Sequence, residues 1–198
     1  MALAKQDKVV VFGGGSDIAK ALKGLYRGET VLVPKSECNV THYFDVLHVV
    51  QHNYDAVGFI NCAGVCCRGS INLPGSLYRT IETNVCGSII ITSAISNVAI
   101  ASGSRIIHIS SMAGLKAKPD MVVYAASKAA IISMVKSVAK GGYDIYAIAP
   151  SIVNSKMNDG IIFDGSKIWQ PADVAKEIIK CIEGKYKRGT IVRMEKKR

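Results

Sequence analysis

The sequence lacks the features expected of a membrane-spanning or secreted protein. None of its uncharged apolar stretches reaches about eighteen residues, the length that a transmembrane helix needs. The first eight residues do not follow the order of a signal peptide, and they lead directly into an apolar run that is typical of a strand. We therefore expect a cytoplasmic protein with no membrane partner.

Paired cysteine motifs of the kind that bind zinc are also missing. The six cysteines form no two Cys-x-x-Cys pairs, so we expect no metal site. Without a secretion signal they are most simply reduced thiols, several of them buried. Cys66 and Cys67 fall in a predicted loop near the candidate site described below, where they serve either as filler or as a reactive thiol.

Acidic residues are few compared with basic ones, 15 against 25, which gives a net charge of +10. Residues 176–198 alone contain nine Lys or Arg and three Glu, a local balance of +6. This end of the chain is either a solvated tail or a surface for an anionic partner, such as a phosphorylated cofactor or an acidic carrier protein. Nucleic acid is not expected as a partner, because no aromatic residues are interleaved with the basic ones.

Short apolar runs alternate with helical patterns along the whole chain. The runs predict strands at 8–12, 30–33, 56–61, 105–109, 144–149 and 190–194. The periodicity predicts helices at 17–25, 43–52, 75–98, 122–139 and 171–183, with Thr41 capping the second. Continuously apolar strands between helices are typical of a parallel sheet covered on both faces. We therefore predict a doubly wound α/β sheet, a Rossmann fold, as a single domain over residues 1–198, with the polar segment 154–170 as a candidate lid.

Three residues have the spacing of an acid/base site. Tyr124 and Lys128 are four residues apart in a predicted helix, so they share one of its faces. An ammonium next to a phenol favours the phenolate and lowers the phenol pKa from about 10 toward neutrality. A tyrosine tuned in this way can exchange a proton with an alcohol or a carbonyl oxygen. Ser111, just after the strand 105–109, can hydrogen-bond the same oxygen.

The glycines at 13–15 join the first predicted strand to the first predicted helix. Such a turn either lets the backbone approach a diphosphate at the helix N-terminus or is simply a tight turn. Lys35 and Ser36 follow the second predicted strand, where an acidic residue would accept from the ribose 2′-hydroxyl of NAD. A lysine beside a hydroxyl suits a 2′-phosphate instead, so we predict NADP(H), with NAD(H) as the alternative.

Three segments resemble the cofactor-binding motifs of the short-chain dehydrogenase/reductase family. Residues 13–19 resemble its T-G-x-x-x-G-x-G turn, Asn61-Cys-Ala-Gly resembles its N-N-A-G, and Pro150-Ser-Ile-Val-Asn-Ser resembles its P-G-x-x-x-T. The resemblance covers nearly the whole chain. The cofactor-binding residues that we expect are Gly13, Gly15, Ser16, Asp17, Ile18, Lys35, Ser36, Asn39, Val40, Asn61, Ala63, Gly64, Tyr124, Lys128, Pro150, Ser151, Val153 and Ser155.

The catalytic tetrad of the family is matched by Asn84, Ser111, Tyr124 and Lys128. The resemblance implies that NADPH gives hydride to a carbonyl carbon while Tyr124 protonates the oxygen. It also implies that Lys128 lowers the tyrosine pKa and binds the nicotinamide ribose, that Ser111 holds the substrate oxygen, and that Asn84 anchors a water linked to Lys128. Asn84 is alternatively a satisfied polar group within a packed helix.

The chain departs from the family pattern mainly in the cofactor motifs. Asp17 and Ala19 stand where the family has its second and third glycines, and Ser151 replaces a further glycine. Asn39-Val40 stands where an Asp-Val pair commonly contacts adenine, although the amide can still accept a hydrogen bond.

The chain is also shorter than the usual family member. Between Val33 and Cys38 there is no room for the helix that normally links the family's second and third strands. The region after Pro150 is compressed as well. We infer a shallow, open pocket that suits a bulky or carrier-bound substrate, or a site completed by a neighbouring subunit.

The function that these features favour is NADP(H)-dependent interconversion of a carbonyl and an alcohol. The substrate is either a small ketone or aldehyde or a carrier-bound group, as in a 3-oxoacyl-carrier-protein reductase. The alternative from another class is a dinucleotide-binding sensor or scaffold without turnover. We also expect a homodimer or homotetramer that pairs through the long helices carrying Asn84 and Tyr124. The apolar stretch 89–95 fits such an interface or an internal core.

Overall fold

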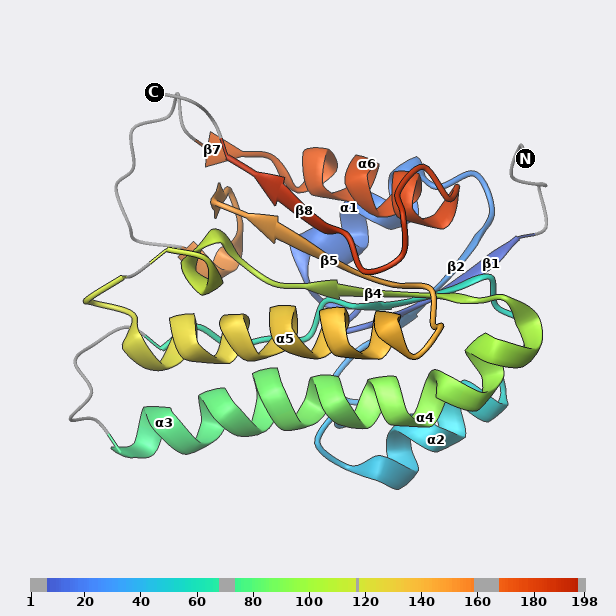
Figure 1. Ribbon diagram of the computed structural model, residues 1–198, viewed down its shortest axis with the longest axis horizontal. Helices are drawn as coiled ribbons and strands as arrows, with labels where there is room; N and C mark the ends of the chain where they lie inside the picture. Colours follow the sequence, from blue (N-terminus) through green and yellow to red (C-terminus); the bar gives the residue numbers. More distant parts are fainter. Residues whose placement is uncertain (1–6, 68–73, 117, 159–167, 196–198) are drawn as a thin grey trace.

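Six parallel strands form the central sheet of the computed structural model, which describes residues 7–67, 74–116, 118–158 and 168–195 (Figure 1). They are β1 (Lys8–Phe12), β2 (Glu29–Val33), β3 (Gly58–Asn61), β4 (Arg105–Ile109), β5 (Ile145–Pro150) and β8 (Ile191–Met194). Their order in the sheet is β2-β1-β3-β4-β5-β8, and each neighbouring pair is parallel. Each predicted strand is therefore present in the sheet.

Helices cover both faces of this sheet. They are α1 (Asp17–Leu25), α2 (Tyr43–Gln51), α3 (Pro74–Ile81), α4 (Gly87–Ser102), α5 (Val122–Lys140) and α6 (Pro171–Ile182). In Figure 1, α1 and α6 lie on one face, and α2, α4 and α5 lie on the other. The doubly wound fold that the alternating pattern predicts is confirmed.

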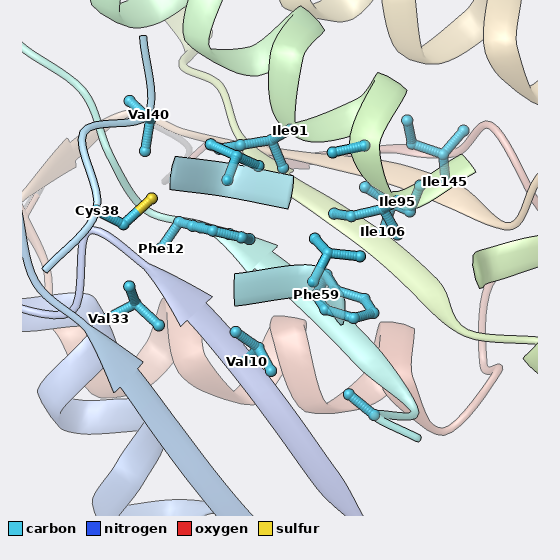
Figure 2. Close-up of a cluster of buried hydrophobic side chains, with 14 of the residues drawn as sticks. Val10, Phe12, Val33, Cys38, Val40, Phe59, Ile91, Ile95, Ile106 and Ile145 are labelled. Carbon is cyan, nitrogen blue, oxygen red and sulfur yellow. The ribbon is translucent and has the colours of Figure 1, made fainter. Parts of the chain in front are cut away.

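The strands are apolar throughout because successive residues point to opposite faces and both faces are buried. On β1, Val10 and Phe12 contribute to the core under α2 and α4, which Figure 2 shows together with Phe59. Val9 and Val11 point the other way, into the core under α1 and α6. These four residues of β1 are fully buried, which explains why the sequence shows no polar alternation here.

The order of the strands reverses between β1 and β3. From β1 the chain passes through α1 to β2 on one side, and then through α2 on the opposite face to β3 on the other side. The carboxyl ends of β1 and β3 are neighbours, with Phe12 in register with Asn61. In open α/β sheets ligands bind in the crevice at such a reversal. The glycine turn and the loop after Asn61 both start there.

The connection from β2 to α2 is short. Residues 34–42 form turns, so the expected absence of a helix between Val33 and Cys38 is confirmed. Thr41 does not cap α2, because the N-cap position is His42 and the Thr41 hydroxyl donates to Asn39 Oδ1 at 3.0 Å. The capping prediction was wrong because the threonine hydroxyl serves a tight turn instead.

The helix predicted at 75–98 is interrupted. A π-helical turn over Glu82–Cys86 separates α3 from α4. Such wide turns insert one extra residue into a helix and are found frequently at functional sites. Apolar periodicity carries no signal for them, so the sequence predicted one continuous helix.

Part of the predicted lid forms regular structure. Ile152–Val153 (β6) pairs in parallel with Ile168–Trp169 (β7), and Lys156–Asn158 form a short 3₁₀ turn. Residues 159–167 lie outside the described residues, so most of the segment 154–170 that was predicted as a lid also lies outside them.

One helix of the described residues, α5, is long and apolar enough to cross a membrane by length and composition alone. Core helices pass the same test. Six of its side chains are buried, namely Tyr124, Ser127, Lys128, Ile131, Ile132 and Val135. Four of these, Tyr124, Ile131, Ile132 and Val135, belong to the buried hydrophobic interior of the molecule.

Candidate active site

Tyr124 and Lys128 lie on the buried face of α5, one helical turn apart. Their exposed fractions are 8 % and 3 %. The Lys128 ammonium lies 5.6 Å from the centre of the Tyr124 ring, and it donates to the Ile109 carbonyl oxygen at 2.9 Å. The helix thus brings the phenol and the amine together next to the carboxyl end of β4, as their spacing predicts.

Burial governs the charge of this lysine. It lowers the pKa of Lys128 from 10.5 to about 8, because removal from water disfavours the ammonium form. At neutral pH most of the lysine is still protonated. It therefore presents a positive charge to Tyr124 at pH 7 and loses that charge as the pH rises through about 8.

Ser111 follows β4 and caps a 3₁₀ turn over Met112–Gly114. Its Oγ accepts from the Ala113 amide at 3.1 Å and donates to the Pro150 carbonyl oxygen at 3.4 Å. Gly114 lets this turn pack against α5, since a Cβ there would lie 2.6 Å from the carbonyl carbon of Lys128. The close approach places the serine turn directly beside the lysine that pairs with Tyr124.

Asn84 sits in the π-helical turn and is fully buried. Its Oδ1 accepts from the Val65 amide at 2.9 Å, and its Nδ2 donates to the Val65 carbonyl oxygen at 2.9 Å and to Ser127 Oγ at 3.0 Å. The side chain therefore ties the loop after β3 to α5. The predicted role as anchor of a water near Lys128 stays a prediction.

Asn61, at the end of β3, belongs to a buried polar network that the sequence did not reveal. Its Oδ1 accepts from the Ala63 amide at 3.0 Å, while its Nδ2 donates to Ser88 Oγ at 3.1 Å and lies 3.2 Å from His108 Nδ1. Burial lowers the pKa of His108 to about 3, so the ring is neutral. Its Nε2 lies 2.9 Å from Thr92 Oγ1. With Nδ1 accepting from Asn61, the neutral ring donates through Nε2 to the threonine.

The glycine turn is formed by close backbone contact. Gly13 has a φ of +73°, and a Cβ there would lie 2.5 Å from the Ala63 amide nitrogen. Ser16 caps α1 by accepting from the Ala19 amide at 3.2 Å. Asp17 accepts from the Lys156 amide at 2.8 Å, so its carboxylate holds the segment after β6 against the start of α1.

These elements surround two adjoining cavities. The larger one, of about 490 Å³, is lined by Tyr124, Lys128 and Ser111 and by residues of the glycine turn, the loop after β3 and the segment after β5. The smaller one, of about 260 Å³, lies over the ends of β1 and β2. The glycine turn and the loop after β3 line both, and so does Arg79. Together they form an elongated site that spans the reversal of the strand order.

The family of this chain follows from a direct comparison. The family model described as short chain dehydrogenase matches residues 1–163. The chain belongs to this family. It is 25 % identical over 223 residues to carbonyl reductase family member 4 of Danio rerio, a match that covers 92 % of this chain and 94 % of the relative.

Solved structures of short-chain dehydrogenases share the fold. A small-chain dehydrogenase in complex with NADPH superposes with a TM-score of 0.86 at 19 % identity, covering 96 % of this chain and 97 % of the other. A 3-oxoacyl-[acyl-carrier protein] reductase from Brucella melitensis with bound NAD gives 0.77 at 20 % identity, covering 94 % and 88 %. The predicted family and fold are therefore confirmed.

Most of the predicted site residues of this short-chain dehydrogenase line the cavities. In the larger cavity these are Gly15, Ser16, Asp17, Ile18, Ala63, Gly64, Ser111, Tyr124, Lys128, Pro150, Ser151, Val153 and Ser155. In the smaller cavity Gly13, Lys35, Asn39 and Val40 are added. Asn61 and Asn84 line neither cavity and support the loop that does.

Two residues that were predicted to bind the adenosine end of the cofactor are less well placed to contact it. Ser36 is exposed and lines neither cavity. Asn39 lines the smaller cavity, yet its Oδ1 already accepts from the amide and the hydroxyl of Thr41, at 3.3 and 3.0 Å. Contacts of these side chains with a cofactor stay predictions.

Sequence reasoning missed Arg79 and Thr83. Both line the smaller cavity, and Arg79 also lines the larger one. Their spacing of four residues, directly before Asn84, places them on one helical face and was a usable signal. Lys35 and Arg79 are the charged residues around the smaller cavity, and its described lining contains no carboxylate.

Proposed function

We propose that the protein transfers hydride between NADP(H) and a carbonyl or alcohol substrate, with Tyr124 as the proton donor and acceptor. The observation that supports this proposal most is that Tyr124, Lys128 and Ser111 line the same cavity as the glycine turn. A cofactor in the crevice and the three polar side chains would therefore meet in one space. The proposed reaction agrees with the family of the chain, whose members are oxidoreductases that act on CH–OH or C=O groups.

The residues around the two cavities fit a phosphorylated dinucleotide. The N-terminus of α1 and the open side of Gly15, where a Cβ would meet nothing within 4 Å, suit a diphosphate. A Cβ at Gly64 would lie 3.4 Å from both Lys128 Nζ and Asn84 Oδ1, so the backbone there leaves room beside the lysine. We propose that Arg79 adds a positive charge at the junction of the cavities and offsets the nearby carboxylate of Asp17.

The bound nicotinamide ring would supply or take up the hydride. In the reducing direction the Tyr124 hydroxyl would donate its proton to the substrate oxygen, and the Ser111 hydroxyl would hold that oxygen by a hydrogen bond. The Lys128 ammonium would stabilise the phenolate that remains. The buried side chains of Asn61 and Asn84 would keep the intervening loop in place through their hydrogen bonds to its backbone.

Lys35 and Arg79 favour NADP(H) over NAD(H), because two cations without a carboxylate suit a 2′-phosphate. Solved relatives are known with either cofactor, one bound to NADPH and one to NAD. The preference is therefore part of the proposal.

Carrier-bound substrates are a second candidate within this proposal. The fold neighbour from Brucella melitensis is a 3-oxoacyl-[acyl-carrier protein] reductase, and the net charge of +10 suits an acidic carrier. We also propose a homo-oligomer, because Ile89 of α4 and Val122 of α5 are 51 % and 37 % exposed on the helices that would pair. A cytoplasmic location stays a prediction.

The test compares the wild-type protein with Tyr124→Phe. NADPH binding is measured by cofactor fluorescence, and NADPH oxidation is followed with ketones, aldehydes and a 3-oxoacyl thioester. We expect both proteins to bind NADPH and only the wild type to oxidise it, since the variant lacks the proton donor. Binding without oxidation of NADPH by any substrate class would favour the sensor or scaffold alternative, and no binding of either dinucleotide would refute the proposal.

A further inference from the structure

The segment that follows β5 forms one wall of the larger cavity. Ser151, Val153 and residues 155–158 line this cavity, and none of them lines the smaller one. The segment contains little regular structure of its own, since it consists of the two-residue strand β6 and a single 3₁₀ turn. Its position therefore depends on hydrogen bonds to other parts of the chain.

Trp169, in β7, holds this segment from outside the cavity. It pairs with Val153 in the two-stranded sheet, and its carbonyl oxygen accepts from the Asn154 amide at 2.8 Å. Its indole Nε1 donates to the Met194 carbonyl oxygen at 3.0 Å, and the same oxygen accepts from the Ser151 amide at 2.9 Å. Trp169 therefore links β6 to the end of β8, next to the carboxyl end of β5 (Figure 1).

Packing fixes the indole ring as well. The ring is half-buried and packs against the core under α1 and α6. The helix α6 begins two residues later, at Pro171, so the backbone after Trp169 is held by regular structure. Trp169 thus has a fixed place from which it can hold β6.

We propose that Trp169 is a positioning residue for hydride transfer, which keeps residues 151–158 against the nicotinamide end of the bound cofactor. The inference rests on the proposed function, in which Tyr124 and Lys128 mark that end of the larger cavity. Trp169 lines neither cofactor cavity, so it acts through the segment that it holds. Because a displacement of about 1 Å can impair a reaction, loosening this wall should weaken both binding and turnover.

Tyr186 offers a matched control. Like Trp169, it is a half-buried aromatic residue that packs against the same core, and both line a groove of about 560 Å³ formed by α6 and β8. Its hydroxyl donates to Glu177, and neither residue lines a cofactor cavity. Substitution by phenylalanine removes one hydrogen bond and keeps an aromatic ring at both positions, but only Trp169→Phe disturbs the support of residues 151–158.

The first measurement needs no cofactor. Hydrogen exchange of the whole protein, followed by mass spectrometry, reports the opening of the peptide that covers residues 151–158. In Trp169→Phe we expect this peptide to exchange about three to ten times faster than in the wild type, the factor that corresponds to one lost hydrogen bond. In Tyr186→Phe its exchange should be unchanged. Equal exchange in the wild type and Trp169→Phe would overturn the proposal, whether or not the protein binds a dinucleotide.

The second measurement separates the two ends of the cofactor. NADPH and 2′-phospho-ADP-ribose, which lacks the nicotinamide, are titrated into the three proteins by calorimetry. Trp169→Phe should bind NADPH about three to ten times more weakly and 2′-phospho-ADP-ribose equally well, and its kcat should fall. Tyr186→Phe should match the wild type in each of these quantities.

The outcomes of this titration distinguish the inference from the proposed function. An equal loss of affinity for both ligands would indicate general loosening and would overturn the role of Trp169. If the wild type bound NADPH and Trp169→Phe bound it as tightly, the inference alone would fail. If the wild type bound neither ligand, the proposed function would fail and the inference with it.

Discussion

Replacing Asn84 by alanine should destabilise the fold as well as the reaction. The side chain is fully buried and makes three hydrogen bonds, two to the backbone of Val65 and one to Ser127. Alanine would leave the amide and the carbonyl of Val65 without these partners. If Asn84 were only a water anchor for catalysis, activity would fall while stability remained.

The size of the effect follows from the groups that lose their partners. An unsatisfied buried donor or acceptor costs about 1–3 kcal/mol, and a half-buried group costs less because water reaches it. Val65 is half-buried, and Ser127 keeps its hydrogen bond to the Tyr124 carbonyl oxygen at 2.7 Å. We therefore expect Asn84→Ala to lower the free energy of unfolding by about 2–4 kcal/mol.

Denaturant unfolding of the two proteins measures this difference, with Asn53→Ala as the matched control. The amide of Asn53 makes a single hydrogen bond, to the Val49 carbonyl oxygen at 2.8 Å in a half-buried position, so its loss should cost about 1 kcal/mol or less. NADPH affinity should fall in Asn84→Ala and not in the control, because the loop beyond Gly64 lines both cavities. A variant of wild-type stability with lowered turnover would refute this reasoning.

Three further predictions concern charge. Lys35→Asp should shift the ratio of catalytic efficiencies from NADPH toward NADH, since a carboxylate accepts from the 2′-hydroxyl and repels the 2′-phosphate; an unchanged ratio would contradict the role of Lys35. Arg79→Gln should weaken NADPH binding by a factor of about 5–20 and NADH binding by less, because Arg79 lines the cavity proposed for the 2′-phosphate, whereas the exposed Arg27→Gln should change neither, and titration by cofactor fluorescence checks both. In Lys128→Met the pH dependence of stability should change: the lysine pKa is lowered from 10.5 to about 8 in the folded state, so the wild type binds fewer protons than its unfolded chain between these values. Denaturant unfolding of both proteins at pH 7.5 and pH 10 measures this effect. From the lower to the higher pH the free energy of unfolding of the wild type should rise relative to that of the variant by up to about 3 kcal/mol. An equal change in the two proteins would speak against a buried lysine.

The sequence predicted the sheet well because its signal is strong. Each strand is buried on both faces, so runs such as Val9-Val-Val-Phe stand out against the helices between them. The pairing of Tyr124 with Lys128 was predictable for a similar reason, since residues four apart on a helix must share a face. Both inferences depend on local geometry alone.

The parts that could not be predicted depend on contacts between distant segments. The π-helical turn at Glu82–Cys86 has no sequence pattern of its own, and its role appears only when Asn84 is seen to bind Val65. Arg79 reaches the junction of two cavities that are formed by three other segments. The sequence places His108 in a strand and gives no sign of its polar role, because its partners Asn61 and Thr92 come from other segments of the chain.

Close backbone contacts also explain which family positions can vary in this chain. A side chain at Gly13 would lie 2.5 Å from the Ala63 nitrogen, and one at Gly114 would lie 2.6 Å from the Lys128 carbonyl carbon, so both must stay glycine. Asp17 replaces a family glycine without such a clash, because it begins α1 and its carboxylate accepts from the Lys156 amide. The departure at Asp17 therefore lies where a side chain gains a partner, whereas Gly13 and Gly114 lie where two backbones meet beside the proposed cofactor.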